Sequence, residues 1–161
     1  MNHLQRFATW VLTTPSLFEL QKPLVDLRHI SVEGNNLGRT YQGNPRLGFI
    51  YQYLCSNILS NSKRYTVELE EVQINTDSGQ TIGAIDLILR NHITQAFEHW
   101  EVAIKFYLLH HGTWYGPNAH DRLDKKLHHM LNHQLKMTSN SLFQQAYPDY
   151  LDMDENLLIQ S

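Results

Sequence analysis

Three ionisable residues interrupt otherwise apolar segments in the middle of the chain. Asp86 lies within the run IGAIDLIL, and Glu101 and Lys105 lie within EHWEVAIKFYLL. Placing an ionised group in an apolar strand is unfavourable unless a cation or hydrogen bonds compensate for the lost hydration. We therefore expect these side chains either to carry out chemistry or to neutralise one another.

The chemistry that suits these residue types is metal-dependent phosphodiester hydrolysis. Mg²⁺ and Mn²⁺ prefer hard oxygen ligands and retain waters for the substrate and the nucleophile, so carboxylates on adjacent strands could hold them. A nearby lysine can orient the attacking water or stabilise negative charge on the phosphate. Asp86 and Glu101 are thus the predicted metal ligands, and Lys105 is the assisting cation. The alternative is a buried salt bridge between Asp86 and Lys105, with Glu101 at an exposed strand edge.

Hydrophobic patterning predicts the strands that would position these residues. Alternation from Lys63 to Asn75 predicts a half-exposed strand with a bulge before Val72, and the run from Ile82 to Leu89 predicts a second strand antiparallel to it. A third strand is expected from Ala96 to Leu108. Its even positions should face the core, namely Trp100, Val102, Ile104, Phe106 and Leu108. His99, Glu101 and Lys105 should then share the opposite face.

Helices are predicted on both sides of this meander. Apolar residues at helical spacing predict a short helix from His3 to Leu12 and a longer one from Pro45 to Leu59, with Asn44 as its cap. A third helix should run from His120 to about Met137. The Gly-rich and Asn-rich segment from Ser31 to Gly43 predicts a long loop, as does GTWYGPN, which begins at Gly112. The terminal segment YLDMDENLLIQS has no evident partner within the chain.

Length and composition favour one compact domain. With 161 residues, 42% of them hydrophobic, the chain can bury a substantial core. We expect a single domain over residues 1–161, with a core at about 44–137, an N-terminal helix and loop at 1–43 and a C-terminal extension at 138–161. The only cysteine, Cys55, excludes an internal disulfide and is expected to be buried.

Charge and hydropathy limit the partners. No apolar run approaches the roughly 20 residues that span a bilayer, so we expect a cytoplasmic protein without a membrane segment. The net charge of -3 does not suit an extended polyanion-binding surface, and any contact with nucleic acid should be local. The acidic and apolar segment from Tyr147 to Ser161 suggests a protein partner or a homo-oligomer as another function.

A helix is followed by a meander of strands, which carry an acid in GAID and then a second acid and a lysine in EVAIK. This order resembles the PD-(D/E)XK nuclease superfamily. More narrowly, RLGFIYQYL, TIGAIDLIL, HWEVAIKFYLL and DRLDKKLHHMLNHQL resemble an uncharacterised bacterial family called domain of unknown function 1853. The resemblance covers roughly Trp10 to Leu135. It implies an α/β fold with a restriction-endonuclease-like core, in which a mixed central sheet built on an antiparallel meander is flanked by helices. It also implies Mg²⁺- or Mn²⁺-dependent cleavage of DNA or RNA.

Carried over residue by residue, the resemblance gives each member of the triplet a role. Asp86 and Glu101 match the two metal-binding acids, Lys105 matches the catalytic lysine, and the main-chain carbonyl of Val102 could complete the metal shell. The superfamily usually places one residue between its second acid and its lysine. Three intervene here, which in a regular strand would separate the two Cα atoms by about 13 Å. A bulge, or a lysine that reaches back, would be required.

Two further departures favour a second function of a different class. Related nucleases often carry an acid where Ala84 stands, and many carry a glutamate in the first long helix where Gln52 or Tyr53 stands. Weaker metal binding or lost activity would follow. The alternative to an enzyme is therefore a catalytically reduced nuclease-fold module that binds nucleic acid or protein.

Other residues could contact substrate or metal. The helix face formed by Arg122, Lys126, His129 and His133 could follow a phosphate backbone or simply face solvent. The His129 and His133 pair also has the spacing of a shared zinc site, although no further ligands follow at a recognisable spacing. His99 could position a ligand, contact substrate or be a hydrogen-bonded sheet histidine, and the last is favoured. Trp114 could stack on a base, but core packing is favoured.

Overall fold

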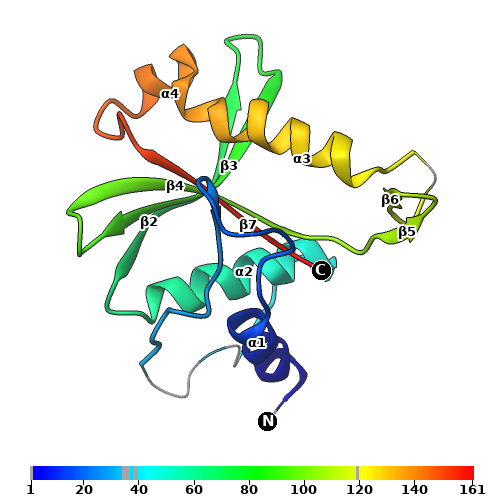
Figure 1. Ribbon diagram of the computed structural model, residues 1–161. Helices are drawn as coiled ribbons and strands as arrows, with labels where there is room; N and C mark the ends of the chain where they lie inside the picture. Colours follow the sequence, from blue (N-terminus) through cyan, green and yellow to red (C-terminus); the bar gives the residue numbers. More distant parts are fainter. Residues whose placement is uncertain (1, 34–36, 38–39, 119) are drawn as a thin grey trace.

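A five-stranded mixed sheet forms the centre of the molecule, with strand order β1-β7-β4-β3-β2 (Figure 1). This computed structural model describes residues 2–33, 37, 40–118 and 120–161. Strands β2 (Tyr65–Asn75), β3 (Thr81–Asn91) and β4 (Ala96–Ile104) form the predicted antiparallel meander. Strands β7 (Asp154–Gln160) and β1 (Leu24–Val25) extend the sheet in parallel. The mixed α/β architecture predicted from the sequence is thus confirmed.

Helices cover both faces of this sheet (Figure 1). On one face lie α1 (His3–Thr13) and α2 (Leu47–Ser60), whose apolar side chains pack against β3 and β4. On the other face lie α3 (Leu123–Asn132), the 3₁₀ helix η1 (Gln134–Ser139) and α4 (Ser141–Ala146). None of the helices in the described ranges is long and apolar enough to cross a membrane. Because β4 lies in the middle of this sandwich, it is buried on both of its faces.

The third strand is shorter than the sequence pattern predicted. Trp100, Val102 and Ile104 are buried in the core beside α2, as expected. The strand ends at Ile104, and the side chains of Phe106 and Leu108 are 56% and 74% exposed. The predicted core positions beyond Ile104 are therefore wrong, because the chain leaves the sheet there and enters the hairpin of β5 (Leu108–His110) and β6 (Thr113–Tyr115).

The C-terminal segment has a partner after all. Strand β7 lies between β1 and β4, and its residues from Leu157 to Gln160 are wholly buried. The Gln160 amide donates to the carbonyls of Val11 and Thr14, and its oxygen accepts from the Tyr51 hydroxyl at 2.8 Å. The apolar residues of this segment are thus buried in a strand that pairs with β1 and β4, which corrects the expectation of a terminus without a partner.

The remaining differences concern the ends of elements. Helix α2 begins two residues later than predicted, so its N-cap is Arg46 and not the predicted Asn44, whose side chain accepts a hydrogen bond from the Arg46 amide. The predicted helix from His120 to Met137 is interrupted at His133, where η1 follows α3. Residues 34–36 and 38–39 of the predicted long loop lie outside the described residues. Cys55 is buried, as predicted.

Candidate functional site

Asp86 lies where β3 loses its regular pairing with β4. The β3–β4 ladder runs up to the pair formed by Leu87 and Trp100 and does not continue to Asp86. On β2, the residue opposite Asp86 is Glu71, which adopts a φ of 50°. This left-handed conformation lies next to Val72, but the register of β2 and β3 is continuous there; the shifts fall between Val67 and Leu69 and between Ile74 and Asn75, so the bulge predicted before Val72 is not at that position. The main chain around Asp86 therefore needs hydrogen-bond partners from outside the regular ladder.

Carboxylates supply these partners. The Val102 amide donates to Asp86 Oδ2 at 2.9 Å, and the Asp86 amide donates to Glu101 Oε1 at 3.4 Å. Glu101 Oε1 also lies 2.7 Å from Nε2 of His99, and both of these side chains are wholly buried. The sequence pattern correctly placed Asp86 and Glu101 side by side, whereas the exposed edge position considered for Glu101 is wrong.

Burial strongly perturbs the acids and the histidine. Burial, followed by the nearby charge of Glu101, raises the pKa of Asp86 to about 8. Burial likewise raises the pKa of Glu101 to about 7, although hydrogen bonds from Asp86 oppose this shift. For His99, burial lowers the pKa to about 4 despite the neighbouring acids. At neutral pH the two carboxyl groups thus favour a shared proton, or a cation in its place.

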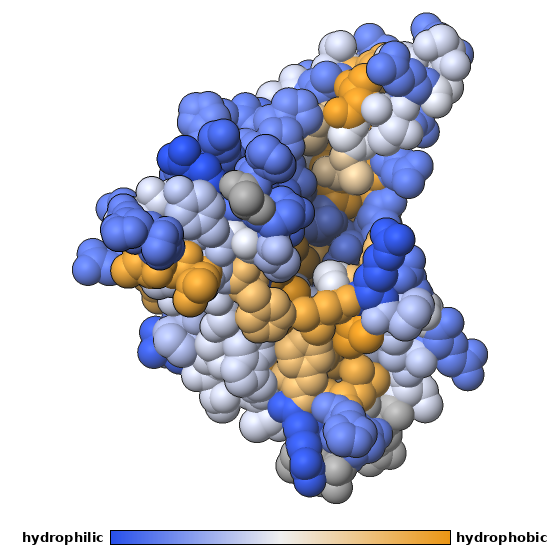
Figure 2. All heavy atoms as spheres, turned by 90° about the vertical axis from the view of Figure 1, so that its right-hand side faces the viewer, coloured by the Kyte–Doolittle hydropathy of each residue, from blue (hydrophilic) through white to orange (hydrophobic). Residues whose placement is uncertain are grey.

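Asp86 opens onto a cavity of about 330 Å³ between α2, β4 and α3. Its lining includes Asp86 and three cationic side chains, those of Arg46, Lys105 and Lys126. Figure 2 shows that this side of the molecule is hollowed near its middle, with apolar surface beside the hollow. Glu101 does not line the cavity and lies buried behind Asp86. The cavity therefore combines one accessible acid with a cationic wall.

Lys105 reaches this cavity although its spacing from Glu101 is unusual. Since β4 ends at Ile104, Lys105 is not part of a regular strand. It forms no ion pair with Asp86 or Glu101 within the described part of the chain, so the predicted alternative of a buried salt bridge is wrong. Val102 also lines the cavity. Of the four residues carried over from the resemblance, Asp86, Val102 and Lys105 thus line the cavity, and Glu101 is buried next to Asp86.

Of the predicted basic helix face, only Lys126 meets the cavity. Its side chain is half-buried, and burial, followed by the charge of Lys105, lowers its pKa. Arg122 instead pairs with Asp124 at 2.6 Å. His129 and His133 stack on each other with ring centroids 4.8 Å apart, outside the cavity lining. The cavity face of this segment is formed by Lys126, Met130 and Gln134, which recur every fourth residue, a spacing that could have identified them.

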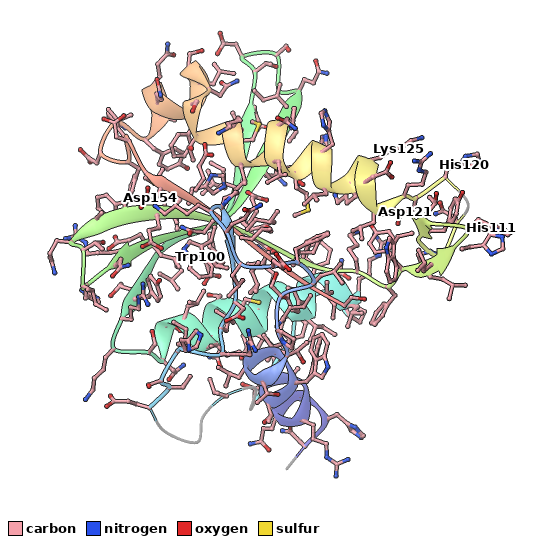
Figure 3. All side chains as sticks on the ribbon, viewed as in Figure 1. Trp100, His111, His120, Asp121, Lys125 and Asp154 are labelled. Carbon is pink, nitrogen blue, oxygen red and sulfur yellow. The ribbon has the colours of Figure 1, made fainter. Side chains whose placement is uncertain are left out.

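Trp114 lies away from the site, in the hairpin of β5 and β6. Its side chain is 42% exposed, so the core packing favoured for it is wrong. Figure 3 shows His111, His120 and Asp121 at the end where this hairpin meets the start of α3, far from Trp100 in the sheet. The hairpin projects beyond the sheet, which explains why its apolar residues remain exposed (Figure 1).

Some buried polar atoms near the cavity have no hydrogen-bond partner. Across the described residues, three buried side-chain polar atoms lack a hydrogen bond: His99 Nδ1, Glu101 Oε2 and Gln134 Oε1. Buried polar atoms are rarely left in this state in native proteins. Glu101 Oε2 belongs to the acid pair, and Gln134 lines the cavity onto which Asp86 opens. Hard oxygen donors of this kind fit Mg²⁺ or Mn²⁺.

Two carboxylates alone do not make a preformed metal cluster. No group of three or more His, Cys, Asp or Glu side chains able to hold a metal occurs among the residues described. A cation at Asp86 would therefore depend on two carboxylates, supplemented by amide or carbonyl oxygens and water, as Mg²⁺ commonly does.

Comparison with known proteins identifies a family. Residues 6–160 match the family described as Domain of unknown function (DUF1853). The chain belongs to this family. No curated protein and no solved structure matches the chain. Since the matched range includes β3, β4, α3 and β7, the candidate site lies wholly within the DUF1853 region.

Proposed function

We propose that this DUF1853 domain is a Mg²⁺- or Mn²⁺-dependent nuclease with a restriction-endonuclease-like core. The observation that carries the proposal is the combination of Asp86 and Glu101, whose carboxyl pKa values are raised by burial, with a cationic cavity wall. The acid pair would hold a hydrated cation, and the wall would hold a phosphate. A site for a neutral substrate would have no need of both features.

In this proposal each charged residue at the cavity has a separate role in hydrolysis. Asp86 and Glu101 would hold the cation, which when bound would supply a Lewis acid that lowers the pKa of a water and offsets negative charge on the phosphate. Lys126 and Lys105 would stabilise the additional negative charge on the phosphate oxygens, and Arg46, at the N-terminal end of α2, would orient the phosphate. The attacking water gives up one proton to solvent as its oxygen bonds to phosphorus, one P–O ester bond breaks, and the leaving oxygen takes up a proton from solvent to become a hydroxyl.

The assay compares wild type, Asp86→Asn and Asp77→Asn, purified in parallel, on single-stranded and double-stranded DNA and RNA. Asp77 is an exposed acid in the turn between β2 and β3 and serves as the matched control. We expect Mg²⁺- or Mn²⁺-dependent cleavage by wild type and Asp77→Asn, and a loss of about 100-fold or more in Asp86→Asn. Equal cleavage by all three proteins would overturn the proposal, since it would indicate a contaminating nuclease.

The burial of Glu101 behind Asp86 favours one alternative function. A nuclease-fold module that binds nucleic acid without cleaving it would keep the cationic wall but would not use the acids as ligands. Such a module would bind oligonucleotides with an affinity that does not change on addition of Mn²⁺ or on the Asp86→Asn substitution.

A further inference from the structure

A second cavity, of about 320 Å³, adjoins the first. The two cavities share Phe49 and Gln52, which project from α2 and form the wall between them. The remaining lining of the second cavity comes from the segment before α2, from α2 itself and from β2: Tyr41, Gly43, Asn44, Tyr53, Glu70 and Glu71. Its volume is at the lower end of the range for small-molecule sites.

The two cavities have opposite chemistry. The first carries three cations, whereas the described lining of the second includes no lysine or arginine and contains the acids Glu70 and Glu71. Phosphate would be repelled from the second cavity. Neutral groups with N–H donors would be accepted there, because carboxylates and the Gln52 amide oxygen accept hydrogen bonds. Glu70 already accepts one from the Ser56 hydroxyl and has acceptor sites left.

Aromatic rings complete the second cavity. Tyr41 and Tyr53 lie with ring centroids 4.9 Å apart, and their hydroxyl groups donate to the carbonyls of Asn44 and Thr40, which fixes the two rings. The Phe49 side chain remains 41% exposed on the dividing wall. Exposed aromatic rings provide stacking surface for planar bases, and stacking contributes about 1–3 kcal/mol per base.

We propose that the second cavity binds an unpaired nucleobase of the strand whose phosphate occupies the first cavity. The base would stack on Phe49 and donate its N–H groups to Glu70 or Glu71. In a duplex, a base is stacked between neighbours and its hydrogen-bonding edge is occupied, so this subsite selects single strands, ends or flipped bases. The inference rests on the proposed function, to which it adds a preference for unpaired substrate.

The experiment measures binding by fluorescence anisotropy in an Asp86→Asn background, which prevents cleavage. The probes are short single-stranded DNA and RNA oligomers and abasic oligomers of the same length and backbone. We expect Phe49→Ala to weaken binding of the base-containing oligomers by about 10-fold and to leave the abasic oligomers unaffected. The matched control is Phe106→Ala, because Phe106 is also exposed but lines neither cavity.

The outcomes separate this inference from the proposed function. If base-containing and abasic oligomers bind equally well, and Phe49→Ala affects neither or both alike, the base subsite is overturned while nucleic-acid binding stands. If no oligomer binds the otherwise unchanged protein, the proposed function fails and the subsite fails with it. Thermal unfolding checks that Phe49→Ala retains the fold, which we expect because alanine suits an exposed helix position.

Discussion

Asp86 and Glu101 are linked by hydrogen bonds across the point where β3 and β4 separate. The Asp86 amide donates to the Glu101 carboxylate, and the Asp86 carboxylate accepts from the amide of Val102, the residue after Glu101. Each carboxylate therefore accepts a hydrogen bond from a main-chain amide of the other strand. This arrangement holds two carboxyl groups side by side in a buried setting, where their mutual repulsion is large.

The first prediction concerns pH and stability. The folded pKa values of about 8 for Asp86 and 7 for Glu101 lie above those of an unfolded chain, near 4. The folded state thus binds more protons between about pH 4 and 8, so the stability from these groups is fully present below about pH 4 and is lost progressively as pH rises to 7 and 8. His99, with its lowered pKa, acts in the opposite direction, but only between about pH 4 and 6.5.

Asp86→Asn should therefore stabilise the protein at pH 8 in buffer containing a chelator. We expect a gain of about 1–3 kcal/mol, or roughly 3–10 °C in Tm, and a weaker dependence of Tm on pH between 6.5 and 8. Thermal unfolding at both pH values measures this, with Asp77→Asn as control. A lower Tm for Asp86→Asn at pH 8 would contradict the electrostatic account of the acid pair.

The second prediction separates the lysines. Lys126 and Lys105 line the cavity, whereas Lys125 is exposed and does not. Lys126→Ala should reduce the rate of cleavage by about 100-fold, because a cation held partly out of water stabilises phosphate charge strongly. Lys105→Ala should also reduce the rate, and Lys125→Ala should leave it within about twofold. Steady-state cleavage assays measure all three, and equal rates for Lys125→Ala and Lys126→Ala would exclude the assigned role.

The third prediction concerns His99 as a positioning residue for Glu101. Because its Nε2 lies 2.7 Å from the Glu101 carboxylate, His99→Leu should weaken Mn²⁺ binding by about 10–100-fold. His99→Gln can retain a donor to the same oxygen and should recover part of the affinity. Calorimetric titration of both variants tests this, and equal affinities for the two would indicate that His99 serves only packing.

The fourth prediction concerns β7. Leu158 is wholly buried in the core beside α2, so Leu158→Ala should lower the free energy of unfolding by about 2–5 kcal/mol. Asp154→Ala, at the exposed start of the same strand, should change it by less than about 1 kcal/mol, since its ion pair with Lys22 is exposed. Denaturant unfolding provides the measurement. Cooperative unfolding of a chain lacking residues 154–161 would contradict the central place of β7.

Local patterns predicted the meander and the acid pair because both arise from residues near one another in sequence. Alternation identified β2 and β4, and charge in apolar runs identified Asp86 and Glu101. The pairing of β7 with β4 could not be predicted, since partners such as Glu98 and Asp154 lie 56 residues apart, with helices and loops between them. The exposure of Phe106 likewise depends on where the chain leaves the sheet. The position of Gln134 at the cavity depends on where the preceding helix ends.

The most direct test of the account is calorimetric titration with Mn²⁺ at pH 7.5 of wild type, Asp86→Asn, Glu101→Gln and the control Asp77→Asn. We predict saturable binding at one site in wild type and Asp77→Asn, with proton release as the cation displaces the proton shared by the two acids. Binding should be lost or weakened at least tenfold in Asp86→Asn and Glu101→Gln. Equal Mn²⁺ affinity in all four proteins, or no binding by wild type, would contradict the assignment of Asp86 and Glu101 as metal ligands.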